Sequence, residues 1–390
     1  MRPVRPGQRA LGLSLIAATA LFGGGVGAIL GACGPFTDVA ADAFCPFVLE
    51  IFYLGITTGT TATTYDPTSN VSRLQMAAFL SRTVDGVLKR GSRRAALDQF
   101  WSSQNATVLG LTTVGGGAAN VRSDGADVWV VNSGVNGTVS RVRGSDGKLL
   151  ETWTGAGNAV GVLVAMGRVF VTGSGTPGSL FRIDPTQAAG AVTAVASNLG
   201  NGPFDITFDG SRIWTANSQG SVSIVTPGAS IPWTVTTVAG FSVPVGSLYD
   251  GTNVWITDQS AGTLLKLDSS GGVLQTVTVG SGPGLPLYDG TNIWVPNKNN
   301  STVSVVRASN GAVLTTLTGN GINSPIAAAF DGQRVLVTNL LGDSVSLWKA
   351  ADLTTIGSIG TGASTFPNDA CSDGINFWVT LYSVGKLARF

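Results

Sequence analysis

The stretch Asp289-Gly290-Thr291-Asn292-Ile293-Trp294-Val295-Pro296-Asn297 combines a tight Asp-Gly turn with an aromatic strand that ends on Asn. A degenerate copy begins at Met166-Gly167, and five further copies begin at Asp124, Asp209, Asp250, Asp331 and Asp373. Consecutive copies start 39 to 43 residues apart. A repeat of roughly 40 to 45 residues is typical of one four-stranded blade of a β-propeller. The sequence therefore predicts a mainly β fold in which seven blades form a closed ring.

The residues around each copy supply the other strands of a blade. A stretch with period-2 alternation and β-branched residues, such as 302–306, follows the copy and indicates a strand. A Gly-containing turn and a further strand come next, for example at 313–317. A short apolar strand such as 326–330 leads into the copy, as expected beside a crowded ring axis. Each repeat thus accounts for four strands.

The two ends of the repeat array predict how the ring closes. The last repeat ends on its third strand, at residues 385–390, and an unassigned strand pattern at 106–111 precedes the first copy. We expect this segment to supply the missing strand of the seventh blade, which joins both ends of the ring and removes exposed sheet edges. The propeller is therefore predicted to span residues 106–390.

The aromatic residues of the repeat have two possible roles. A row of Trp rings can stack on sugars, or it can fill the space between neighbouring blades. Recurrence at one blade position favours the second role. The Asp-Gly pairs are likewise interpreted as turns rather than ion sites, because no Asp-x-Asp-x-Asp cluster accompanies them. Five of the nine Trp residues occupy this position, four residues after the Gly: Trp129, Trp214, Trp255, Trp294 and Trp378.

The composition narrows the classes of function. The 390-residue chain has 43% hydrophobic and 12% charged residues, which suits packed cores. A net charge of +1 without a basic block argues against a nucleic-acid partner. The sequence contains no His, the commonest general base and metal ligand near neutral pH. We therefore expect no catalytic residue, no bound metal and no cofactor.

The amino-terminal segment, residues 1–32, has the pattern of an export signal. Arg2, Arg5 and Arg9 precede an apolar run over residues 10–30. The segment is either cleaved or kept as a membrane anchor, and the glycines at 23–25 favour cleavage because they make a poor spanning helix. The expected location is the bacterial cell surface, the cell envelope or the periplasm.

The three cysteines allow one disulfide at most. Residues 30–33 resemble a bacterial lipobox, in which case Cys33 carries lipid. Alternatively, Cys33 pairs with Cys45, twelve residues later, in an oxidising compartment. We favour the disulfide. The third cysteine, Cys371, lies in the last repeat.

Residues 36–82 resemble a single S-layer homology module. Asn70 or Ser72 can cap its second helix. The apolar residues of that helix, Leu74, Ala77, Ala78 and Leu80, are expected to face the first helix. We assign the module to residues 33–85 and a helical linker to 86–105. The elements that carry the resemblance are Phe36-Thr37-Asp38-Val39, an apolar helix through Phe44, Ile51 and Leu54, the loop 55–59, Tyr65-Asp66-Pro67 and the run 71–80.

The resemblance implies a role and a ligand. Modules of this family hold proteins on bacterial surfaces by binding cell-wall polysaccharide, with a Thr-Arg dipeptide at the start of the second helix. The matching dipeptide here is Ser72-Arg73. Arg73 would suit a polysaccharide with anionic groups; the alternative is an ordinary solvated residue of the first helical turn. Such modules usually occur in threes, and this chain has one.

The strands 128–132 and 335–339 resemble the Tyr-Val-Thr-Asn repeat of a family of bacterial surface propellers, and the resemblance covers residues 106–390. It implies a binding or interaction scaffold, in which an unknown protein or glycan contacts one mouth of the channel. The alternative is a lactonase- or lyase-like enzyme that uses a metal on the ring axis. Turn capping is the competing role for the polar residues at this mouth. These candidate residues are Asp205, Asn323, Asn368 and Asp369.

Overall fold

The computed structural model describes residues 36–39, 45–53, 57–80, 83 and 110–390. The predicted export segment 1–32, Cys33 and the predicted linker 86–105 lie outside these described residues. The chain divides into two compact units, Met1–Asp98 and Gln99–Phe390. No helix within the described ranges is both long and apolar enough to cross a membrane.

The first unit is a small module built on helix α2 (Cys45–Tyr53). Phe36, Val39 and Val48 form its buried core. The Phe36 ring contacts Phe52 edge-on, with 5.2 Å between ring centroids, and contacts Tyr65 at 5.8 Å. These contacts join the Phe-Thr-Asp-Val segment to α2 and to the Tyr-Asp-Pro turn. The predicted first helix is confirmed over the described residues.

Asp38 fastens the turn at Tyr65-Asp66-Pro67. Its carboxylate accepts hydrogen bonds from the backbone N–H of Tyr65 at 2.9 Å and of Asp66 at 2.7 Å. These two N–H donors lower the pKa of Asp38. Asp66 adopts the left-handed conformation, with a φ of 62°. Asp38 therefore stabilises a backbone conformation that non-glycine residues adopt infrequently.

The second helix of the module covers residues 73–80 and begins with a capping box. The Gln75 backbone N–H donates to Ser72 Oγ at 3.2 Å. The Ser72 N–H donates to Gln75 Oε1 at 2.8 Å. Each residue thereby satisfies a donor that a helix start would otherwise leave open. Of the two predicted caps, Ser72 is the one that the structure uses.

The prediction that the apolar residues of this helix face the first helix is wrong for Leu74 and Leu80, which are 84% and 60% exposed. Ala77 is also exposed, whereas Ala78 and Phe79 are half-buried. Residues three and four apart share a helix face. A helix that starts at the Ser72 cap therefore turns the face of Ala78 and Phe79 inward.

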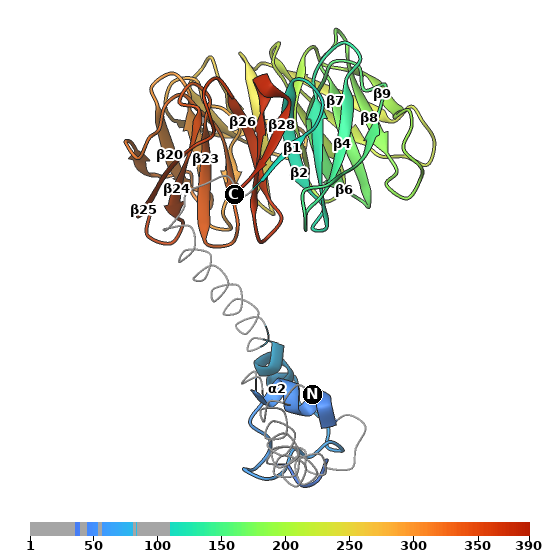
Figure 1. The fold of residues 1–390 in the computed structure, drawn as a ribbon, viewed down its shortest axis with the longest axis vertical. Coiled ribbons are helices and arrows are strands. Elements are labelled where there is room, and N and C mark those ends of the chain that lie inside the picture. Colours follow the sequence, from blue (N-terminus) through green and yellow to red (C-terminus); the bar gives the residue numbers. More distant parts are fainter. Residues whose placement is uncertain (1–35, 40–44, 54–56, 81–82, 84–109) are drawn as a thin grey trace, which may run out of the picture. The chain divides into compact units, whose positions relative to one another are not determined.

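The second unit is a ring of seven antiparallel four-stranded sheets, shown in Figure 1. The predicted fold class is therefore confirmed. The innermost strands pack against one another around the axis. They are β2 (Ala118–Ser123), β6 (Ala159–Ala165), β10 (Pro203–Phe208), β14 (Pro244–Tyr249), β18 (Leu287–Tyr288), β22 (Pro325–Phe330) and β26 (Pro367–Ser372).

The Asp-Gly turns lead from these strands to the second strands, which carry the aromatic residues. The second strands are β3 (Asp127–Asn132), β7 (Arg168–Gly173), β11 (Ile213–Asn217), β15 (Val254–Asp258), β19 (Asn292–Asn297), β23 (Arg334–Asn339) and β27 (Phe377–Leu381).

The third strands follow the predicted alternating stretches closely. They are β4 (Thr138–Arg143), β8 (Gly178–Ile183), β12 (Ser221–Thr226), β16 (Thr263–Leu267), β20 (Thr302–Arg307), β24 (Ser344–Lys349) and β28 (Lys386–Arg389). The outer strands are β5 (Leu149–Trp153), β9 (Thr193–Leu199), β13 (Thr234–Ala239), β17 (Val273–Thr278), β21 (Val313–Leu317), β25 (Thr355–Gly360) and β1 (Gly110–Thr113).

The ring closes in the seventh blade, whose strand order is β1-β28-β27-β26. The register pairs Gly110 with Arg389 and Thr113 with Lys386. Figure 1 shows β1 beside β28. The predicted closure is confirmed, although the strand covers 110–113 rather than ending at residue 111.

The repeated Trp side chains fill the space between blades, as predicted. Trp129 is fully buried and packs with Val162, Val169 and Val171 of the next blade. Trp294 likewise lies against Val335 of the following blade. The interpretation of the Trp row as architecture rather than a sugar platform is therefore confirmed for the described residues.

Candidate functional site

In five of the six Asp-Gly repeats, the Asp of the turn accepts a hydrogen bond from the Trp of the same repeat. In the third blade, Trp214 Nε1 donates to Asp209 Oδ2 at 2.7 Å, and the other carboxylate oxygen accepts the Ser211 and Arg212 N–H groups. Burial alone would raise the pKa of Asp209, but the bonds from Trp214 and the turn amides lower it to about 2. The same bond joins Trp129 to Asp124, Trp255 to Asp250, Trp294 to Asp289 and Trp378 to Asp373.

The sixth blade replaces this bond with an ion pair. Leu336 stands in the Trp position there, and Arg334 Nε donates to Asp331 Oδ2 at 2.7 Å instead. Both side chains are nearly buried. The carboxylate therefore keeps a donor even where the Trp is absent, which identifies the Asp as part of the blade framework.

The Asn that ends the second strand is a second structural element. Asn339 Nδ2 donates to the hydroxyls of Ser344 and Ser346, at 3.1 and 2.8 Å. Its Oδ1 accepts the backbone N–H of Asn323 at 3.3 Å. Asn297 makes the corresponding bonds to Thr302, Ser304 and the Gly280 N–H. The predicted site residue Asn323 thus contributes its backbone to this framework, and its side chain is exposed.

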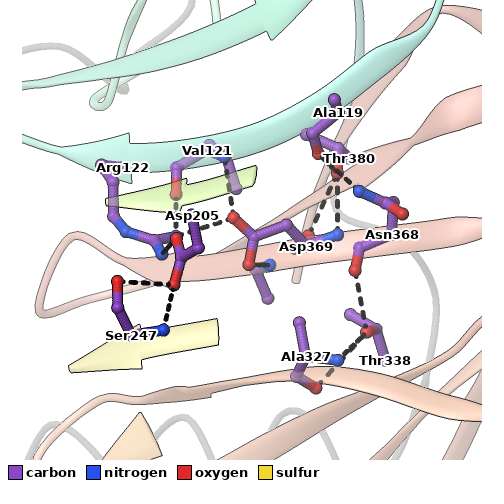
Figure 2. Close-up of polar contacts among 11 residues, drawn as sticks. Ala119, Val121, Arg122, Asp205, Ser247, Ala327, Thr338, Asn368, Asp369 and Thr380 are labelled. Atoms are coloured by element: carbon purple, nitrogen blue, oxygen red, sulfur yellow. Dashed lines mark hydrogen bonds and ion pairs between the residues drawn. The ribbon is translucent and has the colours of Figure 1, made fainter. Parts of the chain in front are cut away.

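Threonines of the second strands join adjacent blades. Thr338 Oγ1 accepts the Ala327 N–H of its own blade at 3.1 Å and lies 3.3 Å from the Asn368 carbonyl of the next blade. Thr380 donates across the ring closure to the Ala119 carbonyl at 2.6 Å. Figure 2 shows both links. The Thr-Asn part of the repeat is therefore engaged in holding blades together.

Three polar residues share one register on the innermost strands. Asn120, Asp205 and Asp369 each stand four residues before the Asp of the Asp-Gly turn, at 124, 209 and 373. All three are almost completely buried. Neither amide atom of Asn120 has a hydrogen-bond partner among the described residues. Asn120 was not predicted as a site residue, although this shared spacing could have identified it.

Arg122 brings Asp205 and Asp369 together, and Figure 2 shows the three side chains converging from different blades. Arg122 Nη1 lies 2.7 Å from Asp369 Oδ2, and Arg122 Nη2 lies 3.7 Å from Asp205 Oδ1. The Arg122 side chain is 29% exposed, whereas those of Asp205 and Asp369 are 1% and 2% exposed. The cluster therefore has one accessible cation above two buried carboxylates.

The two carboxylates have different partners. Asp369 accepts the N–H of Val121 at 3.0 Å through Oδ2 and its neighbour's N–H, that of Ala370, at 2.8 Å through Oδ1. Asp205 Oδ2 accepts the Ser247 N–H at 2.7 Å, but its Oδ1 accepts no hydrogen bond among the described residues. Asn368, beside Asp369, donates from Nδ2 to the Ala119 carbonyl at 3.2 Å.

These contacts shift the pKa values of the cluster. Burial raises the pKa of Asp205 to about 6, against the opposing attraction of Arg122. Burial alone would lower the pKa of Arg122, but the charges of Asp369 and Asp205 raise it. Burial also raises the pKa of the nearby Cys371 thiol, so this thiol is protonated at neutral pH. Asp205 therefore gains a proton just below neutral pH.

A cavity of about 360 Å³ lies on the axis above this cluster. Each innermost strand contributes to the wall of this cavity the residue that pairs with the aromatic position of the second strand. These seven residues form a ring of side chains, in which Arg122 is the only charged residue. The cavity lies along the strand ends that lead into the Asp-Gly turns. The other members of this ring are Leu163, Thr207, Leu248, Leu287, Ala329 and Cys371.

The position of the cavity differs from the predicted mouth, which was placed where loops lead into the innermost strands. Asp369 lines the cavity, whereas Asp205, Asn323 and Asn368 do not. Asp205 lies beneath Arg122 rather than at an open mouth. At the start of these strands, Asp205 accepts the Ser247 N–H of the next blade, and the Ser324 N–H donates to Ser301 Oγ of the preceding blade.

The donor set does not suit a metal on the axis. Within the described residues there is no group of three or more His, Cys, Asp or Glu side chains that could hold a metal ion. The guanidinium of Arg122 already contacts both axial carboxylates. A divalent ion bound by Asp205 and Asp369 would have to displace this cation.

The first unit has a hollow of its own, of about 490 Å³. Its walls include the Thr57–Thr60 segment, Tyr65, Asp66 and Gln75. Arg73 is exposed but is not part of this wall. Cys45 lies in α2, and the predicted Cys33–Cys45 disulfide remains a prediction because Cys33 is outside the described residues.

Comparison with known proteins identifies the first unit. Residues 35–77 match the S-layer homology domain. Domains of this family bind cell-wall polysaccharides, which implies a location at the cell surface or in the envelope. No curated protein matches the chain.

Solved structures identify the fold of the second unit. A catalytically inactive virginiamycin B lyase from Staphylococcus aureus, solved with quinupristin, superposes with a TM-score of 0.61 at 17% identity, covering 72% of this chain and 98% of that chain. Hydrazine synthase from Kuenenia stuttgartiensis gives 0.60 at 16% identity, with 72% and 97% covered. The WD40 propeller domain of Doa1 gives 0.56 at 13% identity, with 72% and 96% covered. At these identities the likeness establishes the propeller fold alone.

Proposed function

We propose that this chain is a non-catalytic protein of the bacterial cell surface, in which the S-layer homology domain attaches to cell-wall polysaccharide and the propeller serves as a binding scaffold. The domain match at residues 35–77 carries this proposal. The hydrogen bonds of Asp38 and the Ser72 capping box support it, because they give the module the turn and the helix start of a folded domain.

Arg73 is the proposed polysaccharide contact. It stands directly after the Ser72 cap, at the amino-terminal end of the second helix, and its side chain is exposed. Among the described residues it forms no ion pair, so its charge is available to an anionic group of the polymer. The partial positive charge of a helix start adds to this attraction.

The proposed binding role of the propeller rests on the accessible side of Arg122. The repeated Asp, Trp, Thr and Asn side chains are used in hydrogen bonds within and between blades, whereas Nε and Nη2 of Arg122 donate no hydrogen bond among the described residues. A lyase or lactonase using an axial metal is the alternative function. Lactone opening that depends on an added divalent ion, and that Asp205→Ala abolishes, would support that alternative instead.

Co-sedimentation with purified cell walls tests the attachment. The full chain should pellet with native walls and stay in the supernatant with walls from which the polysaccharide has been extracted. Arg73→Ala should weaken pelleting by roughly tenfold, the loss expected for one charge-assisted contact. Arg307→Ala is the matched control, because Arg307 is an exposed arginine of the propeller. Equal pelleting with both wall preparations would contradict the proposal.

A further inference from the structure

We propose that the axial cavity binds a small monocarboxylate with an apolar body, whose carboxylate is held by the Nε and Nη2 donors of Arg122. This inference rests on the proposed role of the propeller as a binding scaffold, and it adds the location of the site and the chemical class of the ligand.

The hydrogen bonds of Arg122 use only one nitrogen of its guanidinium, Nη1. Both N–H groups of Nη1 are used, one by the Val121 carbonyl and one by Asp369 Oδ2, each at 2.7 Å. Nε and Nη2 donate no hydrogen bond to any described residue, and Nη2 is 3.7 Å from the nearest carboxylate oxygen, Asp205 Oδ1. Nε and Nη2 form the fork that arginine uses to bind a carboxylate with two parallel bonds.

The walls of the cavity select the body of the ligand. Leu163, Leu248, Leu285, Leu287 and Phe330 supply apolar surface around the exposed face of Arg122. The hydroxyls of Tyr249 and Tyr288 are already bonded to the carbonyls of Gly251 and Gly290, so both rings offer mainly apolar surface. A volume of about 360 Å³ is at the small end of known ligand sites. These features fit an aromatic or short aliphatic acid.

The charges around the guanidinium favour a single negative charge on the ligand. Arg122 faces Asp369 and the Cys371 thiol from β26 and Asp205 from β10, while the neighbouring residues from β14 and β6, such as Ser247 and Leu163, are uncharged. With both carboxylates ionised the cluster has one excess negative charge. A dianion such as phosphate would add two more charges in a poorly solvated site, whereas a monocarboxylate adds one.

Protonation of Asp205 removes that excess charge. Burial raises the pKa of Asp205 to about 6, so the protonated carboxyl is populated just below neutral pH. An arriving carboxylate further favours the protonated form, and ligand binding is therefore accompanied by proton uptake. If only the protonated form binds, affinity should fall roughly 10- to 30-fold as pH rises from about 5.5 to about 7.5.

Isothermal titration calorimetry on the full chain tests this site. The probes are benzoate and 3-phenylpropionate, with benzyl alcohol and benzylamine as the neutral and cationic comparisons. Arg122→Lys keeps the positive charge beside the two aspartates but loses the fork. Asp205→Asn keeps the side-chain shape and removes the titrating group. Arg307→Lys, at an exposed arginine of β20, is the matched control.

The expected result is one site per chain for the carboxylates, with no comparable binding of the alcohol or the amine. Arg122→Lys should weaken binding at least tenfold while Arg307→Lys leaves it unchanged. Asp205→Asn should bind at about pH 7.5 as tightly as the unaltered chain does at about pH 5.5. The proposal is overturned if neither acid binds, or if benzylamine binds more tightly than the acids do. It is also overturned if Arg122→Lys binds the acids as tightly as the unaltered chain does, or if the affinity of Asp205→Asn still falls as pH rises. Wall attachment is measured separately, so either proposal can fail alone.

Discussion

Asp205 and Asp369 contact the same guanidinium, yet their surroundings differ. Asp369 receives donors at both oxygens and lies at 2.7 Å from Arg122. Asp205 has one oxygen without a donor and lies 3.7 Å from Arg122. An isolated buried carboxylate favours its protonated form, because burial penalises the charge and few donors compensate for it. Burial, with one carboxylate oxygen lacking a donor, therefore accounts for the raised pKa of Asp205.

This raised pKa predicts a pH dependence of stability. A carboxyl whose pKa is about 6 when folded and 3.8 when unfolded binds more protons in the folded state between these values. Its contribution is therefore fully present below about pH 4 and is lost as pH rises through about 6. Asp205→Asn should remove this loss, which amounts to roughly 2 to 3 kcal/mol for a shift of this size.

Urea unfolding of both proteins at about pH 4.5 and about pH 7.5 measures this component. Asp209 does not interfere, because its lowered pKa of about 2 confines its own effect to more acidic solutions, where stability is lost as pH falls. If the unaltered chain and Asp205→Asn change in parallel between the two pH values, the ionisation assigned to Asp205 is incorrect.

At the level of single residues, the sequence predicted the roles that follow from a repeated or local sequence pattern. The Trp packing and the Ser72 cap both follow from local pattern. Arg122 was not predicted, because the residue at its position in the other blades is Leu, Thr, Ala or Cys. Its importance comes from contacts with Asp369, 247 residues away, and with Asp205 two blades along the ring. No local pattern encodes such contacts.

Strand β1 is the element on which ring closure depends. It is the only strand of the seventh blade that comes from the amino-terminal side of the propeller, and it pairs with β28. The Val114 N–H donates to the Gly385 carbonyl at 3.0 Å. Thr112 lies two residues earlier, opposite Leu387, and so belongs to the next hydrogen-bonded pair of the same antiparallel ladder.

Thr112→Pro should open the ring at this strand. Proline removes the N–H from the ladder and leaves the Leu387 carbonyl without its donor, at a cost of about 1 to 3 kcal/mol. Thr112→Val is the control: it keeps a β-branched residue and removes only the hydroxyl bond to the Gly147 carbonyl. Thermal unfolding followed by circular dichroism should show a much lower Tm for the proline variant. Equal Tm values for the two variants would contradict the role of β1 in closure.

At the level of elements, the sequence predicted strands better than helix orientation. Alternation fixes which face of a strand is buried, and the predicted 302–306 and 313–317 stretches match β20 and β21. The helix at 73–80 offered apolar residues on more than one side. Its inward face depends on the cap and on the segment packed against it, so the predicted burial of Leu74 and Leu80 failed.

Across the whole molecule, the repeated residues build the propeller framework, whereas residues that occur once, such as Arg122, supply the proposed binding groups. Seven similar sheets provide a rigid ring, in which the repeated polar side chains satisfy one another. Arg122 occurs in one blade and brings a positive charge to a register position where the other blades have uncharged residues. The S-layer homology domain lies in a different compact unit. This division predicts that wall attachment and ligand binding can be altered independently.

The most direct measurement is retention of a radiolabelled benzoate probe by wall-bound protein at about pH 5.5, where Asp205 is largely protonated. Walls loaded with the unaltered full chain should retain probe and protein together. Walls loaded with Arg122→Lys should retain the same amount of protein but at least tenfold less probe, and Arg73→Ala should reduce protein and probe in proportion. The account would be contradicted if Arg122→Lys released the protein from the walls, or if its wall-bound form retained as much probe as the unaltered chain.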